Sequence, residues 1–486
     1  MRRRRRRPRA YRRRSPSRAA AGTRVVSDCS ETFVPAVDWL GGLGADVRGN
    51  AERRAEDLVR LNHGLLSDLQ VRARVGRVRG DPGLHVEAGS RVGAIPLRSP
   101  VTGRPDFGLV VTPRFPWSGV GDLLATTGFR IVPELLPLPE LPQSERRIPP
   151  WVLSSVVLQR LERLLEASTR RFTTVEADLR APRGAVDWTA YASARLPRGR
   201  ALEVPCRYPD LRDDERLRSA IHWTVRRHRD GLLAAPAGGR VVRELLALCE
   251  RLLGRLAGTP PVPPGARLRA AWHRTPFVPR AFREGIAAID WTADERGLAG
   301  LSDLAGLSWR LDMAAFFEAW VEAITAWVAT RTGAFLRAGR EERTRVSLDW
   351  RPRRAGSQRS LLPDLVLSRP GLVVVLDAKY KRHAADIERL GWSGVADRLR
   401  EEHRADLLQA LAYSSLYDAE RIVSLLVYPC GVERWRELAR RRRVLARARV
   451  RSRQRNLEMG LLAVPLGGDP TEPGAMLEQL VREPLS

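Results

Sequence analysis

Several features are scarce in this chain of 486 residues, and each scarcity excludes a class of protein. The four cysteines (Cys29, Cys206, Cys249 and Cys430) form no C-x-x-C pair, which argues against a disulfide scaffold and a thiolate zinc site. The seven histidines lack the spacing of metal ligands. No apolar run approaches the ~18 residues of a membrane helix, so we expect a cytoplasmic protein that does not associate with membranes.

Lysine is nearly absent, because only Lys379 and Lys381 among the 84 basic residues are not arginine. This bias is typical of a GC-rich coding sequence, in which arginine codons displace lysine codons. A lysine that persists in such a chain indicates a chemical need for a primary amine, which can lose its proton, whereas a guanidinium stays protonated and planar. A P-loop is absent as well, so we do not expect this chain itself to hydrolyse nucleotides.

What the chain has in excess is positive charge, with a formal net charge of +28. Residues 1–22 contain 11 arginines, no acidic residue and no apolar core of a signal peptide, and we expect this tail to be disordered. The tail would suit contacts with phosphates. Alternatively, it precedes the true start of translation, although no other methionine occurs before Met313.

The length and the changes in composition predict a multidomain protein. Short β-branched runs broken by Gly, Pro and Asp indicate a β-rich domain over residues 23–150, and apolar residues at helical spacing indicate a helical domain over 151–260. The segment TPPVPPGA at 259–266 is typical of a linker. Residues 267–486 then alternate between helix and strand, which predicts an α/β domain.

Within this last domain, a helix is expected over 311–333, followed by two strands joined by a turn at Arg369-Pro370-Gly371. A helix over 405–417 and a buried strand over 421–429 follow. The arginine-rich stretch RELARRRRVLARARVRSRQRN after residue 435 is expected to form a basic helix, which would either follow DNA phosphates or present a solvated face.

The two predicted strands carry the candidate catalytic residues Asp364, Asp377 and Lys379. Asp377 and Lys379 are two residues apart and so project from the same face, and the tight turn brings Asp364 back beside them. Two converging carboxylates suit Mg²⁺, with Mn²⁺ as an alternative, and the carbonyl of Ala378 would add a ligand. Lys379 would orient or deprotonate a water molecule, as in metal-assisted phosphodiester hydrolysis.

Three further residues join these candidates. Glu318 lies at the edge of the apolar arc of the 311–333 helix and is the candidate third metal ligand, whereas Glu322 points further toward solvent. Gln409 and Tyr413 share one face of the following helix and would bind a phosphate or a metal-bound water. Each residue also has a structural explanation: a turn residue, an ion pair on an exposed strand, or a solvated helix position.

The same residues carry a resemblance to a known family. Pro363-Asp364 with Asp377-Ala378-Lys379 resembles the PD-(D/E)XK nuclease motif, and the QALAY segment from Gln409 to Tyr413 resembles the QxxxY helix of RecB-type members. The longer stretch PDLVLSRPGLVVVLDAKYK, with RADLLQALAYSS, VSLLVYP and the upstream FFEAWVEAI, resembles McrC, the nuclease subunit of McrBC-type restriction systems. The resemblance spans residues 84–430 and is strongest over 311–430.

The resemblance implies a fold, an activity and a set of partners. The carboxy-terminal domain would have the PD-(D/E)XK restriction-endonuclease-like fold and a Mg²⁺ site formed by Asp364, Asp377 and Glu318. The chain would be an endodeoxyribonuclease subunit of a phage-defence system that acts on DNA containing 5-methylcytosine. A hexameric McrB-like AAA+ GTPase would recognise the modified duplex DNA and bind the amino-terminal domain.

Cutting both strands of a duplex requires two active sites, so we expect a second copy of this chain in the cutting complex. Two other functions are also compatible with the residues. One is a RecB-like DNA repair nuclease, which a neighbouring gene for an AAA+ GTPase would argue against. The other is a non-catalytic DNA-binding adaptor of a motor, which would not require Asp364, Asp377 and Lys379 together.

Overall fold

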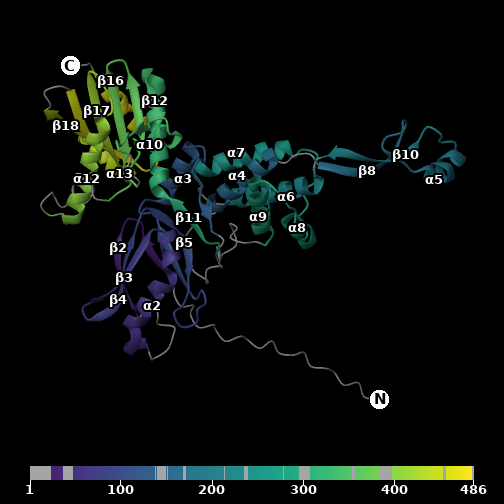
Figure 1. Ribbon diagram of the computed structural model, residues 1–486, viewed down its shortest axis with the longest axis horizontal. Helices are drawn as coiled ribbons and strands as arrows, with labels where there is room; N and C mark the ends of the chain where they lie inside the picture. Colours follow the sequence, from purple (N-terminus) through teal and green to yellow (C-terminus); the bar gives the residue numbers. More distant parts are fainter. Residues whose placement is uncertain are drawn as a thin grey trace. The chain divides into compact units, whose positions relative to one another are not determined.

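The computed structural model describes the following residues: 23–36, 47–136, 138, 149, 151–167, 171–212, 214–234, 239–276, 278–294, 307–352, 356–382, 394, 397–451 and 456–483 (Figure 1). The arginine-rich tail at 1–22 lies outside them. The chain divides into two compact units. One combines Met1–Arg146 with Ala305–Ser486, and the other consists of Arg147–Leu304. None of the helices described is long and apolar enough to cross a membrane.

The first unit contains a six-stranded sheet in the order β12-β15-β16-β17-β19-β18. Its strands are β12 (Phe335–Ala338), β15 (Leu365–Arg369), β16 (Leu372–Ala378), β17 (Arg421–Cys430), β18 (Leu445–Arg451) and β19 (Asn456–Pro465). The central strands β16, β17 and β19 run parallel, and the outer pairings are antiparallel. Parallel strands covered on both faces need continuous apolar runs, and nine of the ten β17 residues are buried.

The hairpin between β15 and β16 forms at the predicted turn. Arg369 pairs with Leu372, so Pro370 and Gly371 make a two-residue turn. Gly371 has a φ of 76°, a left-handed conformation that glycine adopts without steric cost and that follows proline in a type II turn. The turn therefore fixes which residues of the two strands face each other.

Helices and short elements complete this part of the unit: α10 (Met313–Thr332), η3 (Gly339–Glu341), β13 (Val346–Ser347), β14 (Ser360–Leu361), α12 (Asp397–Ser414), α13 (Val432–Arg440) and α14 (Thr471–Arg482). The Asp312 side chain caps α10 by accepting hydrogen bonds from the amides of Ala314 and Ala315. The α10 residues Phe316, Phe317 and Trp320 are fully buried. Both α10 and α12 pack against β16, which carries the candidate site.

The amino-terminal part of the same unit is β-rich, as predicted. It consists of β1 (Thr23–Ser27), β2 (Glu31–Pro35), α2 (Val47–Asp68), β3 (Val71–Val78), β4 (Asp81–Ala88), β5 (Arg91–Leu97), β6 (Phe107–Thr112), α3 (Trp117–Thr126) and β7 (Glu134–Leu135). One sheet has the order β2-β4-β3, and the other has the order β1-β6-β5-β11-β7. The strand β11 (Trp309–Asp312) comes from the carboxy-terminal segment, immediately before α10.

The pairing of β11 with β5 explains why the two segments form one unit. Gly93 of β5 lies opposite Arg310, and a Cβ atom at Gly93 would come within 2.1 Å of the Trp309 carbonyl oxygen. Glycine thus allows the close approach of the two backbones. A long-range pairing of this kind leaves no local sequence pattern, so the predicted separation of residues 23–150 from the carboxy-terminal domain does not match the observed division.

The second unit is mainly helical, as predicted for the middle of the chain. Its elements are α4 (Trp151–Ala167), β8 (Arg171–Leu179), β9 (Ala185–Val186), α5 (Trp188–Ala190), η1 (Tyr191–Arg195), η2 (Leu196–Arg198), β10 (Val204–Arg212), α6 (Glu215–Ala234), α7 (Gly239–Arg255), α8 (Ala266–His273) and α9 (Arg280–Ala293). Figure 1 shows β8 and β10 as a long ribbon that leaves the helices and carries α5 near its far end.

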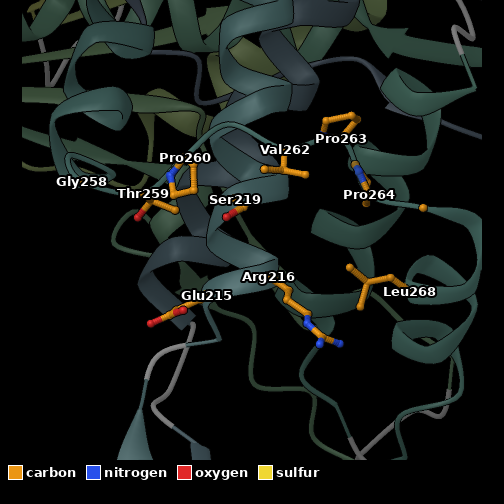
Figure 2. A pocket seen from close by; sticks show the side chains of 11 residues that line it. Glu215, Arg216, Ser219, Gly258, Thr259, Pro260, Val262, Pro263, Pro264 and Leu268 are labelled. Atoms are coloured by element: carbon orange, nitrogen blue, oxygen red, sulfur yellow. The ribbon is translucent and has the colours of Figure 1, made fainter.

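The predicted linker at 259–266 lies inside this unit rather than between domains. The Thr259 carbonyl oxygen lies 2.5 Å from the His222 ring, and the Val262 amide donates to the Ser219 carbonyl at 3.3 Å. Figure 2 shows Pro260, Pro263 and Pro264 of this segment, which together with Glu215, Arg216 and Ser219 of α6 line a cavity of about 570 Å³. Its bonds to α6 hold the segment in the unit, and α8 and α9 extend the unit beyond the predicted boundary at residue 267.

The prediction of one basic helix after residue 435 is wrong. The helix α13 ends at Arg440, and the following arginines belong to a turn and to the edge strand β18. In β18, the arginines Arg447, Arg449 and Arg451 occupy every second position, which is the period of a strand rather than of a helix. The strand pairs with β19 along its whole length, so the sheet determines its conformation.

Candidate functional site

The candidate site lies where β15 begins and β16 ends. Leu365 pairs with Leu376, which places Asp364, the residue before β15, next to Asp377 near the end of β16. The Asp364 carboxylate accepts a hydrogen bond of 2.8 Å from the Ala378 amide and lies within hydrogen-bonding reach of the Asp377 carboxyl group. Asp377 is only 2% exposed. Two acidic groups therefore meet in a largely dry environment, as the turn predicted.

Lys379 joins the two aspartates to helix α12. Its ammonium nitrogen lies 2.7 Å from Asp377 Oδ2 and donates a hydrogen bond of 2.8 Å to Gln409 Oε1. Gln409 in turn donates from Nε2 to the Tyr413 hydroxyl oxygen at 2.9 Å. The backbone amide of Lys379 donates to the Val427 carbonyl of β17 at 2.8 Å. The structure thus links Asp377, Lys379, Gln409 and Tyr413 in one chain of polar contacts.

Burial and crowding raise the pKa of Asp364 to about 8. Loss of solvent is the main cause, and the negative charges of Asp377 and Glu318 add to it. Burial alone would lower the pKa of Lys379, but the carboxylates of Asp377, Asp406 and Asp364 outweigh it and raise that pKa. Without a cation, the site therefore retains a proton on Asp364 and on Lys379 at neutral pH.

Glu318 lies near the two aspartates without joining them in a ligand cluster. It is half-buried on α10, and burial raises the pKa of its carboxyl group, with Glu322 and Asp377 contributing and Arg340 opposing. Among the residues described, no three His, Cys, Asp or Glu side chains are close enough together to hold a metal ion. The structure thus places Glu318 within electrostatic range of the aspartates and does not show it as a third ligand.

Glu322 occupies a different position from the one predicted. It is only 8% exposed rather than directed toward solvent, and its Oε1 atom lies 3.1 Å from an Arg130 nitrogen and 2.5 Å from an Arg340 nitrogen. Arg130 comes from the amino-terminal segment, which the helical period of α10 does not reveal. The two guanidinium groups compensate the buried charge of Glu322, which gives this residue a structural role.

One residue of the site, Asp406, was not predicted from the sequence. Asp406 of α12 is 3% exposed, and its Oδ1 atom lies 2.7 Å from the Lys381 ammonium and 4.0 Å from the Lys379 ammonium. A buried carboxylate therefore pairs with both lysines of the chain. Asp406 precedes Gln409 by three residues and so shares its helix face, which is the sequence signal that would have identified it.

Residues 299–429, which include all six predicted site residues, match the family model described as "McrBC 5-methylcytosine restriction system component". No curated protein matches the chain.

Two solved structures from Thermococcus gammatolerans are similar to the chain. The first is a refined half-complex from a tetradecameric assembly of McrB AAA+ hexamers with bound McrC, with 15% identity, coverage of 94% of this chain and 100% of that chain, and a TM-score of 0.41. The second is the cryo-EM structure of the McrBC complex, with 14% identity, coverage of 63% and 88%, and a TM-score of 0.25. The family match over residues 299–429, the part that carries the candidate site, confirms the predicted resemblance of this chain to components of McrBC-type restriction systems.

Proposed function

We propose that this chain is the metal-dependent endodeoxyribonuclease subunit of a McrBC-type, modification-dependent restriction system. The observation that carries the proposal is the geometry at the end of the β15–β16 hairpin. Asp364 and Asp377 lie side by side there, and Lys379 contacts both Asp377 and Gln409. A buried pair of carboxylates with a lysine is costly for stability alone, because each charge loses its solvation.

The residues present fit a divalent metal ion such as Mg²⁺ or Mn²⁺. The pKa of Asp364 is raised to about 8 because Asp364 is buried beside another carboxylate, and a bound cation would relieve this repulsion. Mg²⁺ usually binds to one or two carboxylates and keeps several water molecules, so Asp364 and Asp377 suffice as direct protein ligands. The Ala378 carbonyl is adjacent to them, and Glu318 would act on a water of the metal.

When bound, the metal would supply Lewis acidity and a water of lowered pKa for attack on a phosphodiester. The remaining roles belong to side chains of this chain. Lys379 holds a proton near Asp377 and would orient the attacking water or neutralise charge that develops on the phosphate. Gln409, held by Lys379 and Tyr413, would fix the direction of the Lys379 ammonium group. Tyr413 is 8% exposed and would act through Gln409.

The fold around the site supports the PD-(D/E)XK assignment. Asp364 lies just before β15, Asp377 lies in β16 and Lys379 lies just after it, where these two antiparallel strands of a mixed sheet meet. The strand β16 also pairs in parallel with β17, and α12 supplies the glutamine. The order of these elements along the chain is the order in which the motif residues were predicted. The RecB-like alternative shares this geometry, and the match to the McrBC family model favours the restriction system.

The expected partners are duplex DNA, an McrB-like AAA+ GTPase hexamer and a second copy of this chain in the cutting complex. The net charge of +28 supplies attraction to DNA without sequence preference. The McrC of Thermococcus gammatolerans is described as bound to McrB AAA+ hexamers. Near the far end of the ribbon, Trp188 and Leu202 are 65% and 75% exposed, and such exposed apolar side chains fit a protein contact. We expect this region, together with the amino-terminal domain, to bind the motor.

The proposal is tested by a cleavage assay on the purified full chain. Methylated and unmethylated plasmids would be incubated with Mg²⁺ or with a chelator, in the presence and absence of the AAA+ GTPase encoded by a neighbouring gene. We expect double-strand cleavage of methylated DNA only with partner, GTP and Mg²⁺ together. Cleavage of a defined sequence by this chain alone would replace the subunit assignment with a self-sufficient restriction enzyme, and no cleavage under any condition would favour the adaptor.

A further inference from the structure

Tyr380, the residue between the two lysines, is held by side chains from the amino-terminal segment. Its hydroxyl donates to Asp28 Oδ2 at 2.5 Å, and its carbonyl oxygen lies 3.7 Å from the thiol of Cys29. Both Asp28 and Tyr380 are buried, with exposures of 1% and 5%. Asp28 and Cys29 are more than 350 residues away along the chain, so this contact is not a product of local folding.

Arg114 also contacts Tyr380, and it bonds both Lys381 and Asp28. Its guanidinium carbon lies 4.6 Å from the centre of the Tyr380 ring, and its Nη2 atom donates to the Lys381 carbonyl at 3.0 Å. Its backbone amide donates to Asp28 Oδ1 at 2.7 Å, so one carboxylate receives hydrogen bonds from both Arg114 and Tyr380. The ring of Phe317 on α10 packs on Tyr380 from the carboxy-terminal segment, with 6.1 Å between ring centres.

The side-chain contacts of residues 379–381 alternate between the carboxy-terminal and the amino-terminal segments of the chain. The ammonium of Lys379 contacts Asp377 and Gln409, Tyr380 contacts Asp28 and Arg114, and the ammonium of Lys381 contacts Asp406. The strand β16 ends at Ala378, and beyond it the described backbone bonds of this segment run from the Lys379 amide to the Val427 carbonyl and from the Lys381 amide to the Lys379 carbonyl. Where backbone pairing ends, side-chain contacts must fix the direction in which the lysines point.

We propose that Asp28, Arg114 and Tyr380 are positioning residues that set the place of Lys379 and Lys381 in the active site. We call these three residues the Tyr380 clamp. The clamp rests on the proposed nuclease function and adds regulation to it. The clamp is complete only when the strands β1 and β6, which lead into Asp28 and Arg114, are in place.

The clamp provides a direct physical route from the amino-terminal domain to the catalytic lysine. A protein partner that binds this domain and shifts β1 relative to β6 would move Asp28 or Arg114, and through Tyr380 it would move both lysines. A buried carboxylate that must keep two donors has few alternative arrangements, so the clamp is either closed or broken. Partner binding would then switch cleavage through these three side chains.

The test uses the full chain with Tyr380→Phe and Asp28→Asn, each of which keeps the size of the side chain and removes one bond. Hydrogen exchange of the amides in residues 376–382 would be measured together with partner-stimulated cleavage and thermal unfolding. We expect about ten-fold faster exchange at 379–381, as for the loss of one buried hydrogen bond to a charged group. We also expect kcat to fall about ten-fold, with KM for DNA little changed.

Two further variants separate positioning from general stability. Tyr191→Phe also removes a tyrosine hydroxyl bond, to the Ala201 carbonyl at 2.8 Å, and should leave exchange at 376–382 unchanged. Arg114→Lys keeps the charge but loses the planar group that both stacks on Tyr380 and binds the Lys381 carbonyl, so it should lower kcat as Tyr380→Phe does.

The outcomes distinguish the clamp from the nuclease assignment. Unchanged exchange at 379–381 in both Tyr380→Phe and Asp28→Asn would overturn the clamp, even if the wild type cuts DNA. Equal acceleration in Tyr191→Phe would overturn it too, since the effect would then be global. A wild-type chain that never cuts would refute the nuclease assignment, and the exchange data would still decide whether the amino-terminal segment holds the two lysines.

Discussion

The charges at the end of β16 and those of the exposed ribbon belong to the same basic chain but have opposite environments. At the site, the side chains of Asp377 and Lys379 are 3% and 14% exposed, and Lys379 also bonds Gln409. On the ribbon, Arg207 pairs with Glu176 at a similar distance of 3.0 Å, with side chains 66% and 71% exposed. An exposed pair contributes roughly 0–1 kcal/mol, whereas a buried pair is costly to break.

The comparison indicates what each residue type is used for. Most arginines supply the long-range attraction and the surface pairs, where solvent screens their charge. Lysine is confined to the one place where a compact, titratable amine lies among carboxylates, and both lysines share Asp406. If this difference reflects function, substitutions at the site should affect cleavage strongly, and substitutions on the surface should affect mainly salt-dependent binding.

The largest expected effect is that of Lys379→Ala, which should abolish cleavage because it removes the amine beside Asp377. Lys379→Arg should not restore activity, since a guanidinium is larger and does not act as a base. Single-turnover cleavage with partner and Mg²⁺ measures the loss, with partner binding and thermal unfolding as controls of folding. Near-native cleavage by Lys379→Ala would show that Lys379 does not act in the site. Near-native cleavage by Lys379→Arg would show only that Lys379 does not act as a base.

Asp364→Asn and Asp377→Asn should each weaken Mg²⁺ binding and reduce cleavage by several orders of magnitude. Each substitution removes one of the two carboxylates proposed as direct ligands of the cation. Calorimetry with Mg²⁺ or Mn²⁺ should use the full chain, because the pairing of β11 with β5 makes a carboxy-terminal fragment incomplete. The metal assignment would fail if both variants bound the cation as tightly as the wild type.

The pH dependence of stability should reveal the crowded carboxylates. The pKa of Asp364 is raised to about 8, so between its ordinary value near 4 and 8 the folded chain binds more protons than the unfolded chain. The contribution of this group to stability is therefore fully present at acidic pH and is lost as the pH rises toward 8. Thermal unfolding of the metal-free chain should show this decline, which Asp364→Asn or added Mg²⁺ should reduce. An identical pH profile for wild type and Asp364→Asn would contradict it.

Asp406→Asn should have an intermediate effect and should shift the pH optimum. The pKa of Lys379 is raised because the nearby carboxylates, which include Asp406, outweigh the opposing effect of burial, so removing the Asp406 charge should lower this pKa. Activity that requires neutral Lys379 would then move to lower pH, with a loss at the optimum of about ten-fold. A pH–rate profile tests this, and an unshifted optimum would confine Asp406 to a structural role.

The smallest effect is expected on the surface, at Arg449 of β18. Arg449→Gln should change stability by less than about 0.5 kcal/mol and leave partner-stimulated cleavage intact. If Arg449 contacts a phosphate, the slope of log K against log salt for DNA binding should fall by about 0.9. Fluorescence anisotropy at several salt concentrations measures this slope. A loss of cleavage in Arg449→Gln as large as that in Asp406→Asn would contradict the difference between site and surface.

The sequence allowed the hairpin and its polar chain to be predicted because both depend on local rules. A proline–glycine turn fixes the pairing of β15 with β16, and side chains two apart on a strand share a face, which brings Asp364, Asp377 and Lys379 together. The helical period placed Gln409 and Tyr413 on one face of α12, where they contact each other.

The rest depends on contacts between distant parts of the chain. Neither the pairing of β11 with β5 nor the bond from Tyr380 to Asp28 leaves a local pattern. The burial of Glu322 depends on Arg130 and could not follow from the period of α10 alone. The basic helix after residue 435 was predicted from composition, although the alternation of arginines in β18 already had the period of a strand.

The most direct test of the account is a metal-rescue experiment at Asp377. Asp377→Cys replaces a hard oxygen ligand with a thiolate, which binds Mg²⁺ poorly and softer metals well. With the partner present, we expect the variant to be inactive in Mg²⁺ and to recover cleavage in Mn²⁺ or Cd²⁺, whereas Lys379→Ala stays inactive in every metal. Full activity of Asp377→Cys in Mg²⁺ alone would show that Asp377 is not a metal ligand and would contradict the proposed nuclease centre.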